Sequence, residues 1–69
     1  MELHWEDDFT IKVRIEKDGA VVLSANEDGL RSLASHLLAL AEEDLGSHIH
    51  YDEGNSLEEG SAELIVEKI

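Results

Sequence analysis

One segment with helical periodicity lies between two pairs of strand-like segments, and this order limits the folds open to the chain. Apolar and polar residues alternate over residues 9–15, and a second, mainly apolar strand candidate follows at residues 20–25. Apolar residues then recur every three or four positions as far as Leu45, alternation returns at residues 47–52, and residues 62–69 form the last strand candidate. Alternation is the pattern of half-buried strands, and the longer spacing is that of an amphipathic helix. The sequence therefore predicts the order ββαββ.

Local signals mark the boundaries of these elements. Asp18-Gly19 separates the first two alternating segments, and this dipeptide is typical of a tight hairpin turn. Asn26 occupies the position of a helix N-cap, because acidic residues follow it and its side chain can accept a hydrogen bond from the first turn. Gly46 is expected as the glycine that ends the helix, which gives a helix of about 18 residues.

The helix is expected to cover one face of a sheet. Its apolar residues form one stripe, which we expect to be buried, with none left in solvent: Leu30, Leu33, Ala34, Leu37, Leu38, Leu40, Ala41 and Leu45. One helix can cover only one face, and antiparallel sheets tolerate one wet face. We predict an α+β fold in one domain, residues 1–69, with a four-stranded, mainly antiparallel sheet in the order 2-1-3-4.

Five further residues carry specific expectations. Trp5 is expected to close the small core as a lid, with an interface anchor as the alternative. His36 lies off the centre of the apolar stripe, so we expect it at the edge or exposed. Tyr51 and Leu57 are expected to face inward, and Gly60 to hold a backbone conformation that a Cβ atom disfavours.

The charge of the chain restricts its partners. The 69 residues include 17 acidic and 5 basic side chains, for a formal charge of −12. Such a surface repels phosphates and anionic lipids, so nucleic acid and membranes are not expected as ligands. It attracts basic proteins over long distances, and the alternative is that the charge only keeps the protein soluble. The chain has no cysteine, no apolar run long enough to span a bilayer, and an acidic N-terminus unlike a signal peptide, so we expect a cytoplasmic protein.

The His-x-His pattern is the main candidate site. His48, His50 and Asp52 share one face of a strand because side chains alternate across it. We expect an open sheet face that includes Lys12, Arg14, His48, His50, Asp52, Glu63, Ile65 and Glu67. Two imidazoles with Asp52 or Glu63 are a possible zinc or nickel ligand set. The alternative is two exposed histidines hydrogen-bonded to neighbouring carboxylates.

Nothing in the sequence indicates catalysis. The paired carboxylates at residues 42–44 and 58–59 are typical of solvated faces, and a catalytic pair needs burial to separate the two pKa values. Gly60-Ser61 lacks the surroundings of a nucleophile elbow. We predict no catalytic residue, no enzyme activity and no cofactor.

The segment from Gly46 to Lys68, with its His-x-His-x-Asp and Leu-x-x-Gly-Ser patterns, resembles a family of small α+β immunity proteins of bacterial polymorphic toxin systems. The helix, with Asn26-x-x-Gly29-Leu30, is similar to that of the same family. The resemblance implies a cytoplasmic protein that binds and neutralises a cognate toxin, and the acidic charge favours a basic, nuclease-like toxin. The alternatives are a metal-binding module using His48, His50 and Asp52, and a structural homodimer. If the chain is an immunity protein, we expect it to be a monomer or a weak homodimer. The candidate contact residues are His48, His50, Asp52, Glu58, Glu59 and Glu63.

Overall fold

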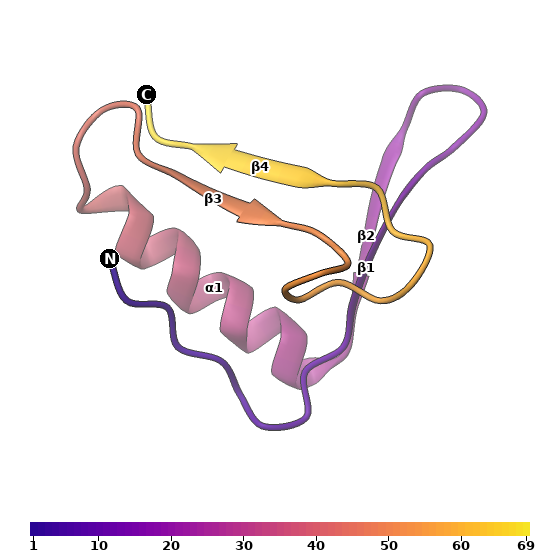
Figure 1. Ribbon diagram of the computed structural model, residues 1–69, viewed down its shortest axis with the longest axis horizontal. Coiled ribbons are helices and arrows are strands. Elements are labelled where there is room, and N and C mark those ends of the chain that lie inside the picture. Colours follow the sequence, from indigo (N-terminus) through magenta and orange to yellow (C-terminus); the bar gives the residue numbers. More distant parts are fainter.

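The computed structural model describes residues 1–69 and has the predicted order of elements. Figure 1 shows the order as β1 (Ile11–Ile15), β2 (Val21–Ala25), α1 (Glu27–Ala41), β3 (His48–Tyr51) and β4 (Leu64–Glu67). The prediction of an α+β chain with the order ββαββ is confirmed. The one helix, of 15 residues, falls short of the length and apolar character that crossing a bilayer requires.

The strands form two separate two-stranded antiparallel sheets, β1–β2 and β3–β4, and not the single four-stranded sheet predicted. The order 2-1-3-4 is also wrong, because β1 does not pair with β3. The loop before β4 occupies the edge of β1 instead: Glu58 N–H donates to the Ile11 carbonyl at 2.9 Å, and Ala62 N–H to the Val13 carbonyl at 2.8 Å. A strand edge whose groups are already bonded cannot accept another strand.

The turn of the first hairpin forms as predicted. Gly19 has φ +92°, a conformation that costs glycine little and other residues more. The Asp18 carboxylate accepts a hydrogen bond from the Ala20 N–H at 3.0 Å, which closes the turn. The hairpin projects from one end of the molecule (Figure 1). Its outer residues therefore have little to pack against, and Val21 and Leu23 are exposed.

Helix α1 begins as predicted and ends earlier. The Asn26 side chain accepts a hydrogen bond from the Gly29 N–H at 2.8 Å, the expected N-cap bond. The helix stops at Ala41, and its C-cap is Glu42 in a right-handed conformation. Gly46 is not the residue that ends the helix; at φ +88° it turns the chain into β3, and its N–H donates to the Lys68 carbonyl.

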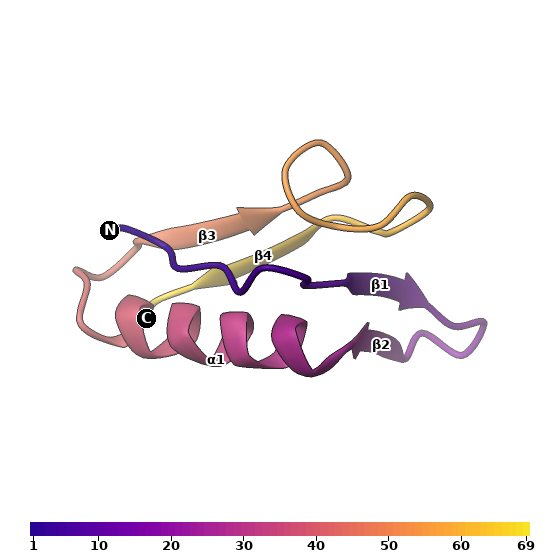
Figure 2. The same ribbon diagram turned by 90° about the horizontal axis from the view of Figure 1, so that it is seen from below.

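The N-terminal segment, residues 1–10, runs antiparallel to α1 along the side away from β4 (Figures 1 and 2). Every second residue bonds a side chain of the helix or its cap through a backbone group, at 2.7–3.1 Å: His4 with His36, Glu6 with Ser32, Asp8 with Asp28, and Thr10 with Asn26. Polar helix side chains thus provide the partners that a neighbouring strand would otherwise supply. One flank of α1 is thereby directed toward this segment.

The core lies between α1, the two hairpins and the N-terminal segment. Its seven buried apolar residues are Ile11, Val13, Leu33, Leu40, Ile49, Tyr51 and Leu57. The inward positions predicted for Tyr51 and Leu57 are confirmed, with exposures of 1% and 5%. Gly60 has φ +87°, which confirms the expected need for glycine there.

The predicted helical stripe is only partly buried. Leu33 and Leu40 lie in the core, whereas Leu30, Leu37 and Leu38 are 55%, 48% and 73% exposed. The buried face of α1 instead includes two polar residues, Ser32 and His36, each 0% exposed. The prediction of an exposed or edge His36 is therefore wrong. The reason is the bonding to the N-terminal segment, which fixes the rotation of the helix about its axis.

Candidate functional site

The β3–β4 hairpin places the two histidines of the predicted site on its outer face. In the register of this pair, His48 lies opposite Glu67 and His50 opposite Ile65. Ile49 and Tyr51 point the other way and are buried, as alternation predicts. The outer face is therefore exposed because its neighbours on the strand hold the core.

His50 is the centre of a small charged cluster. Its Nε2 atom lies 3.0 Å from a Glu63 carboxylate oxygen and 3.8 Å from one of Asp52. The three side chains come from β3, the residue after β3 and the residue before β4, and all are at least one-third exposed. In the protonated form of His50 these contacts are ion pairs, and at the surface such pairs stabilise the fold by about 1 kcal/mol or less. Their geometry presents carboxylate oxygens to solvent.

His48 does not join this cluster. Its Nδ1 atom lies 3.4 Å from the Gly46 carbonyl, a weak contact within its own turn. No three histidine or acidic residues come together in a geometry that could hold a metal ion. The alternative metal set of His48, His50 and Asp52 is therefore not formed. Its residues share a face, as predicted, but the His50 ring nitrogen faces Glu63 and Asp52 while His48 bonds elsewhere.

The loop between β3 and β4 is held by its own side chains. The Asn55 N–H donates to the Asp52 carboxylate at 3.0 Å, and the Asn55 side-chain amide donates to the His50 carbonyl at 2.9 Å. The Glu53 carboxylate accepts from the Gly60 N–H at 2.9 Å, and Leu57 is inserted into the core. These bonds position Asp52 beside His50. They also leave its carboxylate on the surface.

Two of the predicted contact residues lie apart from the His50 cluster. Glu58 and Glu59 are exposed in the loop, and neither carboxylate takes part in an ion pair or hydrogen bond. Lys12 and Arg14, expected on the same open face, lie on the β1–β2 hairpin, where Arg14 pairs with Glu16 at 3.2 Å. Because the two sheets are separate, the predicted continuous face is divided into two surfaces.

A buried polar centre that sequence reasoning missed lies beneath the surface cluster. His36 Nε2 is 2.7 Å from the His4 carbonyl, and His36 Nδ1 is 2.8 Å from the Tyr51 hydroxyl. A carbonyl only accepts, so Nε2 carries the proton. Burial lowers the pKa of His36 despite the opposing effect of the His4 carbonyl, so the ring is neutral and Nδ1 accepts from the Tyr51 hydroxyl. Burial also raises the pKa of Tyr51 to about 12, which keeps that donor protonated.

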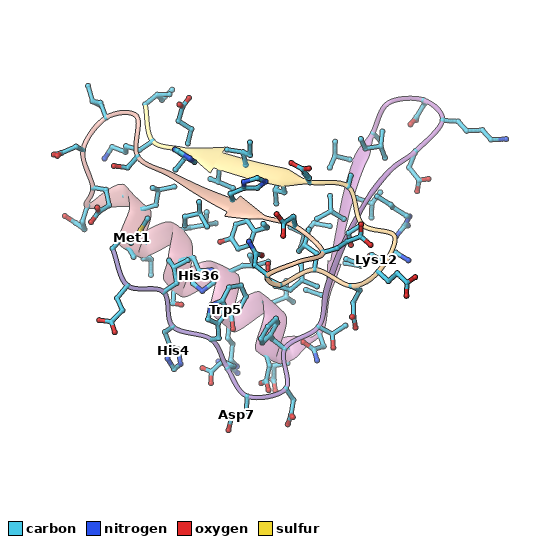
Figure 3. The ribbon with its side chains drawn as sticks, viewed as in Figure 1. Met1, His4, Trp5, Asp7, Lys12 and His36 are labelled. Carbon is cyan, nitrogen blue, oxygen red and sulfur yellow. The ribbon has the colours of Figure 1, made fainter.

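Trp5 covers this buried centre. Its ring lies 4.4 Å from His36 and 4.5 Å from Phe9, measured between centroids, and meets Tyr51 edge-on at 6.2 Å. Figure 3 shows Trp5 and His36 side by side between the N-terminal segment and α1, while His4 and Asp7 point outward. Trp5 is thus a lid on the core, the first of the two roles that the sequence allowed. The sequence contained one signal for this packing: residues 4, 6, 8 and 10, which bond α1 and its cap, alternate with the apolar residues Leu3, Trp5 and Phe9.

Comparison with known proteins gives one match. The family model described as immunity protein 32 matches residues 20–69, which include β2, α1, β3 and β4. No curated protein and no solved structure matches the chain. The N-terminal segment and β1 lie outside the matched range. The match therefore includes the His50 cluster but not the segment that covers His36.

Proposed function

The chain belongs to the immunity protein 32 family, and from this premise we propose that it neutralises a cognate bacterial toxin by direct protein–protein contact. The family match over residues 20–69 is the observation that carries the proposal. The protein would act by covering a functional surface of the toxin, without chemistry of its own. A toxin made by the same cell would meet it in the cytoplasm.

We further propose that the toxin is basic and of the nuclease type. The formal charge of −12 supports this, because an acidic inhibitor is attracted to the cationic cleft that a nuclease uses for phosphates. Long-range attraction raises the association rate, and close contacts then set the dissociation rate. The association rate should therefore fall as ionic strength rises.

The outer face of β3–β4 and its loop provide the proposed polar contacts. Asp52 and Glu63 offer carboxylate oxygens around His50, and the loop bonds hold Asp52 in place before a partner binds. Pre-organised acceptors bind arginine and lysine side chains with less loss of conformational entropy. The full set of proposed contact residues is His48, His50, Asp52, Glu58, Glu59 and Glu63.

A rescue assay tests the proposed function. Candidate toxin genes, beginning with the open reading frames that flank this gene, would be expressed from an inducible promoter in a test bacterium, with and without this protein. We expect growth only in its presence, and a complex of the two proteins that survives gel filtration. Continued toxicity with the folded protein present at equal or higher abundance would contradict the proposal.

A double variant tests the proposed contacts. His48→Ala/His50→Ala removes two exposed side chains, so it should weaken the complex and leave the fold intact. The matched control is His4→Ala, because the His4 side chain is also exposed but lies on the N-terminal segment. Equal affinity of the double variant and the control would exclude the two histidines as contacts.

A further inference from the structure

Helix α1 exposes a regular apolar face that nothing in the molecule covers. The leucine face consists of Leu30, Ala34, Leu37, Leu38 and Ala41, all exposed and spaced by three, four or one residues along α1. Such spacing is that of a buried helical face. Ten large apolar side chains of the chain are exposed and only seven apolar residues form the core, so apolar exposure is unusually high here.

The leucine face is exposed because the other side of the helix is committed elsewhere. Ser32 and His36 bond the N-terminal segment and are fully buried. At about 100° per residue, the exposed leucines of the face lie at least about 120° around the helix from Ser32. Rotating the helix to bury these leucines would break the bonds of Ser32 and His36 to the N-terminal segment, and neither partner of each bond would gain a replacement. The exposure is therefore a consequence of the fold and not of local fraying.

The charge around this face selects the kind of partner. From Glu27 to Asp44 the chain has five acidic side chains and one basic one. The single cation, Arg31, is already paired with Glu27 at 3.3 Å. A second copy of the chain, with its own charge of −12, would be repelled from this region. An apolar centre with an acidic rim complements an apolar patch surrounded by lysine and arginine.

We propose that the leucine face of α1 is the apolar anchor for the cationic toxin, an inference that rests on the proposed function and deepens it. The face supplies the dehydrated centre of the interface, and the acidic residues at the two ends of α1 supply its rim. The His50 cluster then adds polar contacts at a separate surface. In protein interfaces, a few well-packed side chains near the centre carry most of the affinity.

The test compares two matched double variants. Leu37→Gln/Leu38→Gln changes the leucine face, where the side chains are 48% and 73% exposed. Ile15→Gln/Val21→Gln changes two exposed apolar residues that pair on the β1–β2 hairpin, outside both proposed contact surfaces, and are 64% and 62% exposed. Glutamine has nearly the helix propensity of leucine, so α1 should persist. Circular dichroism and Trp5 fluorescence would check folding, and Leu38→Gln alone provides a milder variant.

The probe is an inactive variant of the toxin identified by the rescue assay, with binding measured by titration calorimetry. We expect the helix variant to bind at least about tenfold more weakly than the wild type, and the strand variant within about threefold of it. A loss in the helix variant no larger than that in the strand variant overturns the inference but leaves the proposed function intact. Absence of binding and rescue by the wild type overturns the proposed function itself. A dimer of the free protein that the helix variant dissociates would assign the face to a second copy and also overturn the inference.

Discussion

Replacing Tyr51 by phenylalanine isolates the buried hydrogen bond to His36. The ring stays in place, because Tyr51 is 1% exposed and its edge-on contact with Trp5 does not involve the hydroxyl. The change removes the donor that lies 2.8 Å from His36 Nδ1 and leaves that acceptor buried without a partner. An unsatisfied buried acceptor costs about 1–3 kcal/mol. A chain of this length has a total stability of about 3–10 kcal/mol, so the loss should be large in proportion.

Urea denaturation monitored by the fluorescence of Trp5, the only tryptophan, measures this loss. We expect Tyr51→Phe to lower the free energy of unfolding by about 1–3 kcal/mol and the melting temperature by at least about 4 °C. In a His36→Leu background the same substitution removes a hydroxyl that has already lost its acceptor, so its cost there should be near zero. This background therefore serves as the control.

Two results would refute the reasoning. A loss below about 0.5 kcal/mol in the wild-type background would mean that water or another group satisfies Nδ1. An equal loss in both backgrounds would show that the hydroxyl acts through packing and not through His36. Either outcome would contradict the assigned hydrogen bond from the Tyr51 hydroxyl to His36 Nδ1.

Three other substitutions or conditions test the packing around α1. Burial lowers the pKa of His36 in the folded protein, so the unfolded chain binds the extra proton first as the pH falls. The contribution of His36 to the free energy of unfolding should therefore be complete above pH 6.5 and decrease below it. In His36→Leu, a plot of the free energy of unfolding against pH should lose this part of its slope. Leu40 lies in the core at 4% exposure, so Leu40→Ala should lower the free energy of unfolding in urea by about 2–5 kcal/mol. Leu38 is 73% exposed, so Leu38→Ala should change it by less than about 0.5 kcal/mol. Similar losses in the two variants would contradict the orientation of the helix. Gly29→Ala should lower the melting temperature although alanine favours helices by about 1 kcal/mol, because the added Cβ would lie 2.6 Å from the Thr10 carbonyl oxygen; a raised melting temperature would show that this close contact relaxes freely.

The elements of this fold could be predicted because each depends on neighbours in the sequence. The turn at Gly19 and the N-cap at Asn26 are local hydrogen-bonding arrangements, and both form as expected. Alternation placed Tyr51 in the core and His50 on the surface, because strand side chains point to opposite faces wherever the strand lies. The candidate site on β3–β4 was therefore predictable as a shared face.

The arrangement of the elements could not be predicted in this way. The edge of β1 was taken by the loop containing Glu58 and Ala62, and no periodicity in the sequence indicates which segment bonds a strand edge. The helix offered two candidate faces, one apolar around Leu37 and one mixed around His36. Hydrophobicity alone favoured the first, but the backbone of the N-terminal segment needed hydrogen-bond partners that only the second could provide.

The sequence by itself determined the order and type of the secondary-structure elements, the turn at Gly19, the acidic charge and the strand face that holds His50. The tertiary structure decided which side of α1 is buried, and with it the burial of His36 and the exposure of Leu38. The physical reason is that strands and turns are governed by local geometry, whereas the rotation of a helix is governed by everything that packs against it. Here four backbone groups from residues 4–10 outweighed the hydrophobic stripe.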